Sequence, residues 1–199
     1  GLGKVMATYS PEDKLHLGVV GLGTGNTAVY GDENARLAFF EIDADVISIA
    51  SEQFTYLADS QAEITIELGD ARLTLERSEP LAFDVLAIDA FTSDAIPTHL
   101  LTIEAFQQYM RHLKENGVLA VHISNRHLDL QPVIAAASEA LSMPLRFVRS
   151  DASGVESGST WVLISRDEER LNAIETAASG VIPSRLWTDS YSSILPLIQ

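Results

Sequence analysis

The chain has 199 residues, which suits one domain, and 46% of them are hydrophobic. Its 28 Asp and Glu residues against 13 Lys and Arg give a formal net charge of −15, which argues against a nucleic-acid partner and favours cationic ligands. The absence of cysteine excludes disulfides, thiolate metal sites and thiol nucleophiles. No run approaches the roughly 20 apolar residues of a membrane span, so we expect no membrane contact by this chain itself.

Short apolar segments alternate with segments of helical periodicity, a pattern typical of βαβ units around a parallel sheet. In chain order, the predicted elements are the strands 17–21 and 38–41, the helix 44–57, the strands 64–68 and 85–89, the helix 103–113, the strand 118–123, the helix 130–141, the strands 145–148 and 160–165, and the helix 167–179. The polar stretch between the last two strands predicts an antiparallel hairpin at the sheet edge. The pattern therefore predicts one α/β domain with helices on both faces of a mostly parallel, seven-stranded sheet.

Ligands of open parallel sheets bind beyond the carboxyl ends of the strands, so the strand ends hold the candidate site residues. The first strand runs into a turn with Gly21, Gly23 and Gly25, where alternate glycines allow a sharp turn and close approach of a ligand to the backbone. Asn26 stands where a nicotinamide fingerprint would have its third glycine. The turn is instead similar to the first motif of S-adenosylmethionine-dependent enzymes, although a purely structural turn would look the same.

Acidic residues end the next two strands. Glu41 lies about 20 residues after the first glycine, where a carboxylate can accept hydrogen bonds from both ribose hydroxyls. Dinucleotide enzymes and sulfonium-nucleoside enzymes both use such an acid, so Glu41 predicts a nucleoside without choosing between them. Asp70 could bind the exocyclic amine of adenine, with Ala71 as a main-chain donor beside it. It could also cap a helix, and both roles could hold together.

The fourth strand ends in Asp89, after an apolar run. Burying a carboxylate there costs free energy unless a cation or a donor lies nearby. Asp94 follows in a loop that Pro97 helps to shape. Two carboxylates near the reacting end of a ligand suit a cationic substrate better than an acidic one.

These motifs resemble those of the polyamine aminopropyltransferases, the spermidine synthase family, whose catalytic domain has a Rossmann-like methyltransferase fold. The resemblance covers nearly the whole chain and is nearest to the spermidine-synthase-like domains fused behind multi-pass membrane segments in bacteria. The matching stretches are 18–25, 41–43, 69–72, 89–97, 121–125 and 187–191.

The resemblance implies decarboxylated S-adenosylmethionine as co-substrate, an amine or polyamine as acceptor, and no metal. In the implied reaction an amine nitrogen attacks the propyl carbon next to the sulfonium and methylthioadenosine is released. The residues that it implies for nucleoside binding are Gly21, Gly23, Thr24, Gly25, Glu41, Asp70 and Ala71. The catalytic residues that it implies are Asp89 and Asp94.

The chain departs from the family pattern where the family holds its amine. Thr24 replaces an aspartate of the glycine loop, and Asp94 lies five residues after Asp89, whereas the family has the shorter D-x-x-D-P-x-G-P. Residues 1–199 are expected to lack the small N-terminal β-domain that covers the amine channel. These departures leave the nucleoside site intact and put polyamine recognition in question.

Further polar residues follow the strand ends. His122, Asn125 and His127 come after the fifth predicted strand, and His99 lies near the Asp94 loop; each could contact substrate or satisfy loop backbone groups. The histidine spacing is not that of a metal site. In the tail, Asp189 and Tyr191 could close over the pocket or simply pack the C-terminus.

Three functions stay open on this sequence: aminopropyl transfer to an amine, methyl transfer from intact S-adenosylmethionine, and nucleoside binding without catalysis as part of a membrane protein. We expect the chain in the cytoplasm, alone or as the cytosolic domain of a larger membrane protein. A homodimer is compatible with each of these functions.

Overall fold

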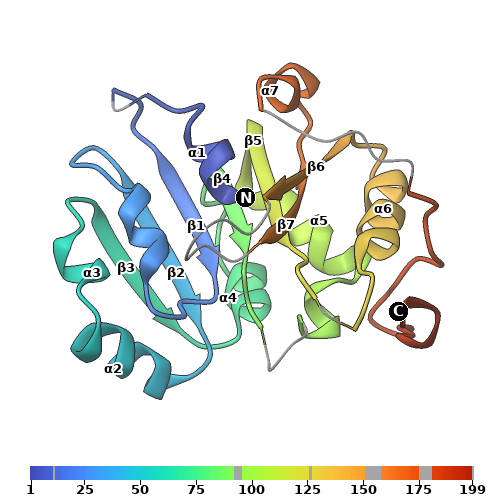
Figure 1. Ribbon diagram of the computed structural model, residues 1–199, viewed down its shortest axis with the longest axis horizontal. Helices are drawn as coiled ribbons and strands as arrows, with labels where there is room; N and C mark the ends of the chain where they lie inside the picture. The colour runs from blue at the N-terminus through green and yellow to red at the C-terminus, as the bar shows by residue number, and fades with distance from the viewer. Residues whose placement is uncertain (11, 92–95, 126, 151–157, 175–180, 199) are drawn as a thin grey trace.

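The computed structural model describes residues 1–10, 12–91, 96–125, 127–150, 158–174 and 181–198. In these ranges one sheet has the strand order β3-β2-β1-β4-β5-β7-β6 (Figure 1). Its strands are β1 (His16–Val20), β2 (Arg36–Glu41), β3 (Glu63–Leu68), β4 (Phe83–Ile88), β5 (Leu113–His122), β6 (Leu145–Ser150) and β7 (Ser159–Ile164). The α-helices are α1 (Leu2–Met6), α2 (Ala44–Gln53), α3 (Tyr56–Asp59), α4 (Ala71–Arg77), α5 (Ile103–His112), α6 (Gln131–Ala140) and α7 (Glu168–Asn172).

Strands β1 to β5 run parallel, and β7 lies antiparallel between β5 and β6. The predicted fold class, a mostly parallel seven-stranded sheet with an antiparallel hairpin at one edge, is therefore confirmed. The order of strands reverses between β1 and β4. From β1 the chain continues to β2 and β3 on one side of the sheet, and then returns to place β4 and β5 on the other side of β1. In open α/β sheets this switch point is where a ligand crevice forms.

Two apolar cores lie on opposite faces of the sheet. Helices α4, α5 and α6 pack on one face, and α1, α2 and α7 pack on the other. Successive strand residues alternate between the two cores, as in β4, where Leu86 and Ile88 belong to one core and Val85 and Ala87 to the other. Strand β4 is thus apolar on consecutive positions because both of its faces are covered.

The predicted helix 44–57 is confirmed over 44–53 but is interrupted at residues 54 and 55. The chain is extended at Phe54, which divides the segment into α2 and α3. The division brings Leu57 against the glycine turn, where a Cβ on Gly25 would lie 2.9 Å from Leu57 Cγ. Tertiary packing thus overrides the helical periodicity of this segment.

The turn after β1 leads into a 3₁₀ helix, η1 (Asn26–Tyr30), a segment for which no element was predicted. The predicted helix 167–179 is shorter, since α7 ends at Asn172, although residues 175–180 lie outside the described ranges. Across the described residues, none of the helices has the length and apolar character that crossing a membrane would require.

Candidate functional site

Hydrogen bonds between neighbouring strands continue past the strand ends and align the candidate residues. The Asp89 N–H donates to Val20 O at 2.9 Å, and the Gly21 N–H donates to Phe40 O at 2.8 Å. On the next strand pair, the Gly69 N–H donates to Glu41 O at 2.8 Å. The backbone at the ends of β1 to β4 is therefore fixed at one edge of the sheet.

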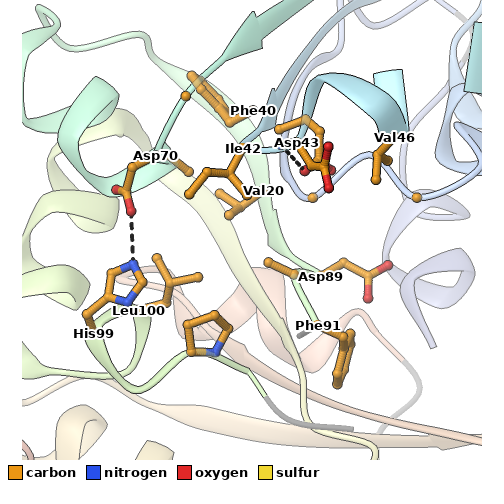
Figure 2. Close-up of a pocket in the computed structure, with 17 residues that line it drawn as sticks. Val20, Phe40, Ile42, Asp43, Val46, Asp70, Asp89, Phe91, His99 and Leu100 are labelled. Carbon is orange, nitrogen blue, oxygen red and sulfur yellow. Dashed lines mark hydrogen bonds and ion pairs between the residues drawn. The ribbon is translucent and has the colours of Figure 1, made fainter. Parts of the chain in front are cut away.

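A cavity of about 500 Å³ opens at this edge (Figure 2). Residues from four strand ends and from the 3₁₀ helix η2 (Thr98–Leu100) share its wall. The lining residues with polar side chains are Glu41, Asp43, Asp70, Asp89 and His99. Figure 2 shows Asp70 with His99 on one side of the cavity and Asp89 with Phe91 on the other.

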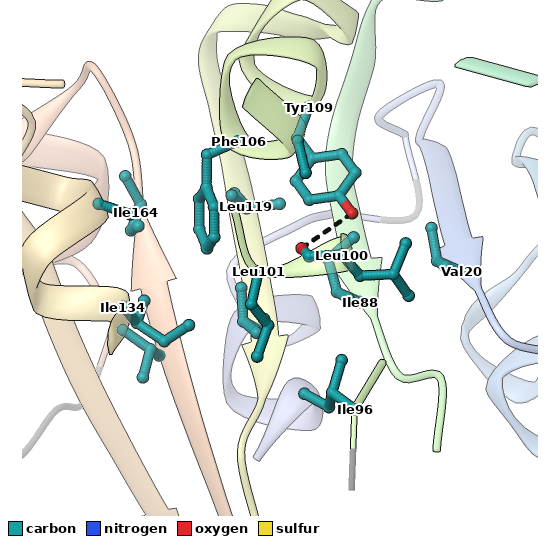
Figure 3. Packing of buried hydrophobic residues seen from close by; sticks show 14 of the residues in the cluster. Val20, Ile88, Ile96, Leu100, Leu101, Phe106, Tyr109, Leu119, Ile134 and Ile164 are labelled. Atoms are coloured by element: carbon teal, nitrogen blue, oxygen red, sulfur yellow. Dashed lines mark hydrogen bonds between the residues drawn. The ribbon is translucent and has the colours of Figure 1, made fainter. Parts of the chain in front are cut away.

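The apolar core holds η2 in place at the wall of the cavity. Tyr109 of α5 is fully buried, and its hydroxyl donates to Leu100 O at 3.1 Å (Figure 3). Burial raises the pKa of the Tyr109 phenol well above its usual range, so this group stays a neutral donor. The bond ties η2, and with it His99, to the apolar core.

Gly21 sets the distance between the glycine turn and β4. Its φ of +96° lies in the region that favours glycine, and an added Cβ would lie 2.6 Å from Asp89 O. No side chain fits there without moving the Asp89 backbone. Gly21 therefore positions Asp89 in addition to lining the cavity.

The other residues of the turn divide into two groups. Gly23 lines the cavity, and a Cβ there would meet no atom within 4 Å. Thr24 and Gly25 are not among the lining residues, and Gly25 instead faces Leu57. Of the four predicted binding residues of the turn, the structure thus brings Gly21 and Gly23 to the cavity.

Glu41 is buried, with 8% of its surface exposed, and lines the cavity from the end of β2. Its Oε2 accepts from the Leu22 N–H at 2.9 Å, and its Oε1 accepts from the Asp43 N–H at 3.0 Å. A carboxylate has about four acceptor positions, so each oxygen keeps one for a further donor. Glu41 is therefore a rigid acceptor whose free positions suit a pair of hydroxyl groups.

Asp70 caps α4, as one of its two predicted roles required. Its Oδ1 accepts from the Leu73 N–H at 2.9 Å, and its Oδ2 lies 3.1 Å from His99 Nε2. Ala71 also lines the cavity, at the first position of α4. The cap orients Asp70 Oδ2 along the cavity wall, and this oxygen is paired with His99.

The tail reaches the same wall through Asp189. Arg72 binds the Asp189 carboxylate with both of its terminal nitrogens, and the Thr102 hydroxyl donates to Asp189 Oδ1 at 2.8 Å. The Arg72 guanidinium lowers the pKa of Asp189, and the carboxylate raises the pKa of Arg72. Asp189 thus pins the tail to α4 beside Asp70, whereas Tyr191 packs under Arg185 away from the cavity lining.

Asp89 has a histidine partner behind it. Asp89 Oδ1 lies 2.6 Å from His122 Nδ1, and His122 Nε2 lies 2.8 Å from Ser124 Oγ. The Thr160 N–H donates to Ser124 Oγ at 2.8 Å. The structure therefore links Asp89 to β5 and β7 through a continuous chain of hydrogen bonds.

The remaining polar residues after β5 have structural roles. Asn125 Oδ1 accepts from the His127 and Leu128 N–H groups, each at 2.8 Å, and so satisfies the loop backbone. His127 is exposed, and neither residue lines the cavity. Asp94 lies outside the described residues.

Four carboxylates, of Glu41, Asp43, Asp70 and Asp89, line the cavity, and no Lys or Arg is among the described lining residues. The site is therefore electrostatically suited to a cation. Elsewhere in the described ranges, His, Asp and Glu side chains do not gather in threes in a way that could hold a metal ion.

The sequence predicted the position of the site but not the hydrogen-bond partners of its carboxylates. It placed Glu41, Asp70 and Asp89 at one edge, but it did not pair Asp70 with His99 or Asp89 with His122. His122 comes from β5, which the strand order places beside β4, and His99 comes from η2. The positions of His122 near the end of a predicted strand and of His99 near the Asp94 loop were the available signals.

Comparison with known proteins supports the predicted similarity. No family model matches the chain. Over 119 residues it is 29% identical to a polyamine aminopropyltransferase of Vibrio vulnificus, a match that covers 57% of this chain and 39% of that protein. The chain thus spans well under half the length of this curated relative.

Solved structures share the fold. The spermidine synthase of Thermotoga maritima superposes with a TM-score of 0.62 at 18% identity, covering 81% of this chain and 57% of that one. Human methyltransferase-like protein 13, solved in complex with SAH, gives 0.63 at 18% identity and covers 89% and 83%. The predicted methyltransferase-like fold is confirmed, and one relative in sequence is a polyamine aminopropyltransferase.

Proposed function

We propose that this domain transfers an aminopropyl group from decarboxylated S-adenosylmethionine to an amine. The observation that carries the proposal is the charge of the cavity, which is lined by four carboxylates and, among the described residues, by no Lys or Arg. A donor without a carboxylate and an acceptor with ammonium groups are both cations, and both suit such a wall. The intact cofactor would bring its own carboxylate into the same acidic space.

The lining residues divide between the two ends of this donor. Glu41 has acceptor positions for the two ribose hydroxyls, and Asp70 with the Ala71 N–H suits the adenine edge. Asp89 stands at the opposite side of the cavity, where the sulfonium and the acceptor would meet (Figure 2). The acceptor side would also include Asp94, by its similarity to the family motif.

The reaction needs an amine without its proton. A free alkylamine has a pKa near ~10 and is mostly protonated at neutral pH. The nitrogen forms a bond to the propyl carbon beside the sulfonium, and the carbon–sulfur bond breaks with its electron pair going to sulfur. Asp89 first holds the ammonium group and then accepts the proton that the nitrogen loses. Methylthioadenosine leaves as a neutral product.

The test begins with calorimetric titration of decarboxylated and intact S-adenosylmethionine, followed by assay of methylthioadenosine release with 1,4-diaminobutane. We expect preference for the decarboxylated donor, and release that falls about 100-fold or more in Asp89→Asn. Binding of methylthioadenosine should change by no more than about twofold, because Asp89 lies away from the adenine end. Asp59→Asn, an exposed aspartate at the end of α3, is the matched control.

Methyl transfer is the second candidate, because the fold is shared with a human methyltransferase and the free acceptor positions of Glu41 suit the ribose of intact S-adenosylmethionine equally well. Preference for intact S-adenosylmethionine, with no release of methylthioadenosine, would establish it in place of aminopropyl transfer. Binding without turnover of either donor would point to a nucleoside-binding domain without catalysis.

A further inference from the structure

We propose that His122 is the positioning residue of Asp89: its Nδ1–H holds one carboxylate oxygen and leaves the other for the acceptor amine. The inference rests on the proposed function for its consequence but on geometry for its contact. Asp89 Oδ1 and His122 Nδ1 are 2.6 Å apart, and both side chains are partly buried, with exposed fractions of 31% for Asp89 and 20% for His122.

The partners of His122 indicate which ring nitrogen carries the proton in the neutral form. An ionised carboxylate only accepts, so His122 Nδ1 must be the donor to Asp89. The Thr160 N–H occupies one lone pair of Ser124 Oγ, which leaves the hydroxyl hydrogen free to donate to His122 Nε2. In its neutral form, His122 is therefore held as the Nδ1–H tautomer.

Ser124, His122 and Asp89 are hydrogen-bonded in the same order as a Ser-His-Asp hydrolase triad, but the opposite end of the series faces the cavity. Asp89 lines the cavity, and Ser124 does not. Ser124 Oγ also accepts a backbone N–H, which occupies one of the lone pairs that a nucleophile would use. The acid is therefore the group presented to substrate, and the serine is the remote anchor.

Aromatic packing fixes the plane of the imidazole. The ring stacks on Trp161 of β7 at a centroid distance of 4.5 Å and an interplanar angle of 2°. Phe91 also contacts the imidazole in a T-shaped arrangement, at a centroid distance of 4.9 Å and an interplanar angle of 79°. With the ring clamped, the direction of Nδ1–H is set before any ligand arrives, which is the preorganisation that proton transfer at a fixed geometry needs.

The kinetic test compares two substitutions. His122→Phe keeps an aromatic ring on Trp161 but has no donor, whereas His122→Asn places an amide N–H near the position of Nδ1. We expect His122→Phe to lower kcat for methylthioadenosine release by about 10- to 100-fold, with the KM for the donor changed by no more than about twofold. His122→Asn should recover most of kcat, and His127→Phe, at an exposed histidine outside the cavity, should match the wild type.

A spectroscopic test needs no turnover. Nitrogen-15 NMR of the histidine rings should show His122 as the Nδ1–H tautomer with a strongly downfield proton, and Asp89→Asn should lose that downfield signal. An Nε2–H tautomer in the wild type would overturn the proposal. So would a wild-type kcat in His122→Phe, or a kcat in His122→Asn that is no higher than that of His122→Phe. Absence of methylthioadenosine release from the wild type counts against the proposed function instead, and the tautomer in the same sample still decides the contact.

Discussion

Glu41 and Asp89 are both cavity carboxylates, but different groups hold them. Glu41 accepts two backbone N–H groups, so its orientation follows from the path of the main chain. Asp89 accepts from a side chain, His122, whose own position depends on β7. The end of the cavity proposed for the nucleoside is thus fixed by backbone geometry, and the end proposed for the reaction by side-chain packing.

Glu41→Gln should weaken nucleoside binding and lower stability. The amide nitrogen of Gln would face either the Leu22 or the Asp43 N–H, which leaves a buried donor without an acceptor. We expect about 10-fold weaker binding of methylthioadenosine by calorimetry, and a loss of about 1–3 kcal/mol in the free energy of unfolding by urea titration. Glu67→Gln, on the exposed edge of β3, is the control, and equal effects at both sites would contradict a special role for Glu41.

Alanine at Gly21 and at Gly23 should separate close packing from backbone strain. Both residues have positive φ, but only at Gly21 would the Cβ meet the Asp89 carbonyl. We expect Gly23→Ala to lose about 1 kcal/mol from strain alone and Gly21→Ala to lose about 2–4 kcal/mol. Urea unfolding measures both, and similar losses would show that the contact with Asp89 relaxes freely.

At the scale of elements, strand positions were predictable and helix lengths were less so. Every predicted strand appears, because apolar residues on consecutive positions mark strands covered on both faces. The helices depended on tertiary contacts, as Leu57 shows by packing against Gly25 where α2 gives way to α3. Helix α4 was missed as a helix, although its capping residue, Asp70, was recognised.

The end of α5 introduces a pH dependence into folding. His112 is fully buried, its Nε2–H donates to Leu75 O at 2.8 Å, and the Leu81 N–H donates to Nδ1 at 3.3 Å. Burial lowers the pKa of His112, and the nearby charge of Arg111 adds to this. The unfolded chain therefore binds a proton near pH ~6.5, where the folded chain does not, so stability is lost as pH falls through that range.

We expect the free energy of unfolding to fall between about pH 7.5 and about pH 5.5 more steeply in the wild type than in His112→Gln. The difference is at most about 1.4 kcal/mol per pH unit, the limit for one proton. Urea titrations across this range measure it. The exposed His127→Asn variant should keep the wild-type slope, and a His112→Gln slope equal to it would rule out His112 as the source.

At the scale of the molecule, net charge should act on the acceptor before it arrives. The chain carries a formal net charge of −15, and the described cavity wall is acidic, so a dication is attracted to it over long distances. Dissolved salt screens this attraction. We expect the KM for 1,4-diaminobutane to rise several-fold from about 20 mM to about 300 mM NaCl. Binding of neutral methylthioadenosine should hardly change, and a parallel change in both would point to a general effect of salt on folding.

The two ends of the cavity draw on different stretches of the chain. The nucleoside wall comes from β1 to η2, in one continuous part of the sequence, whereas the support behind Asp89 comes from His122 of β5 and Trp161 of β7. Substitutions in β5 and β7 would therefore change the support behind Asp89, while the wall proposed to hold the nucleoside keeps its own residues. Such modularity offers the fold a simple evolutionary route between different group-transfer chemistries.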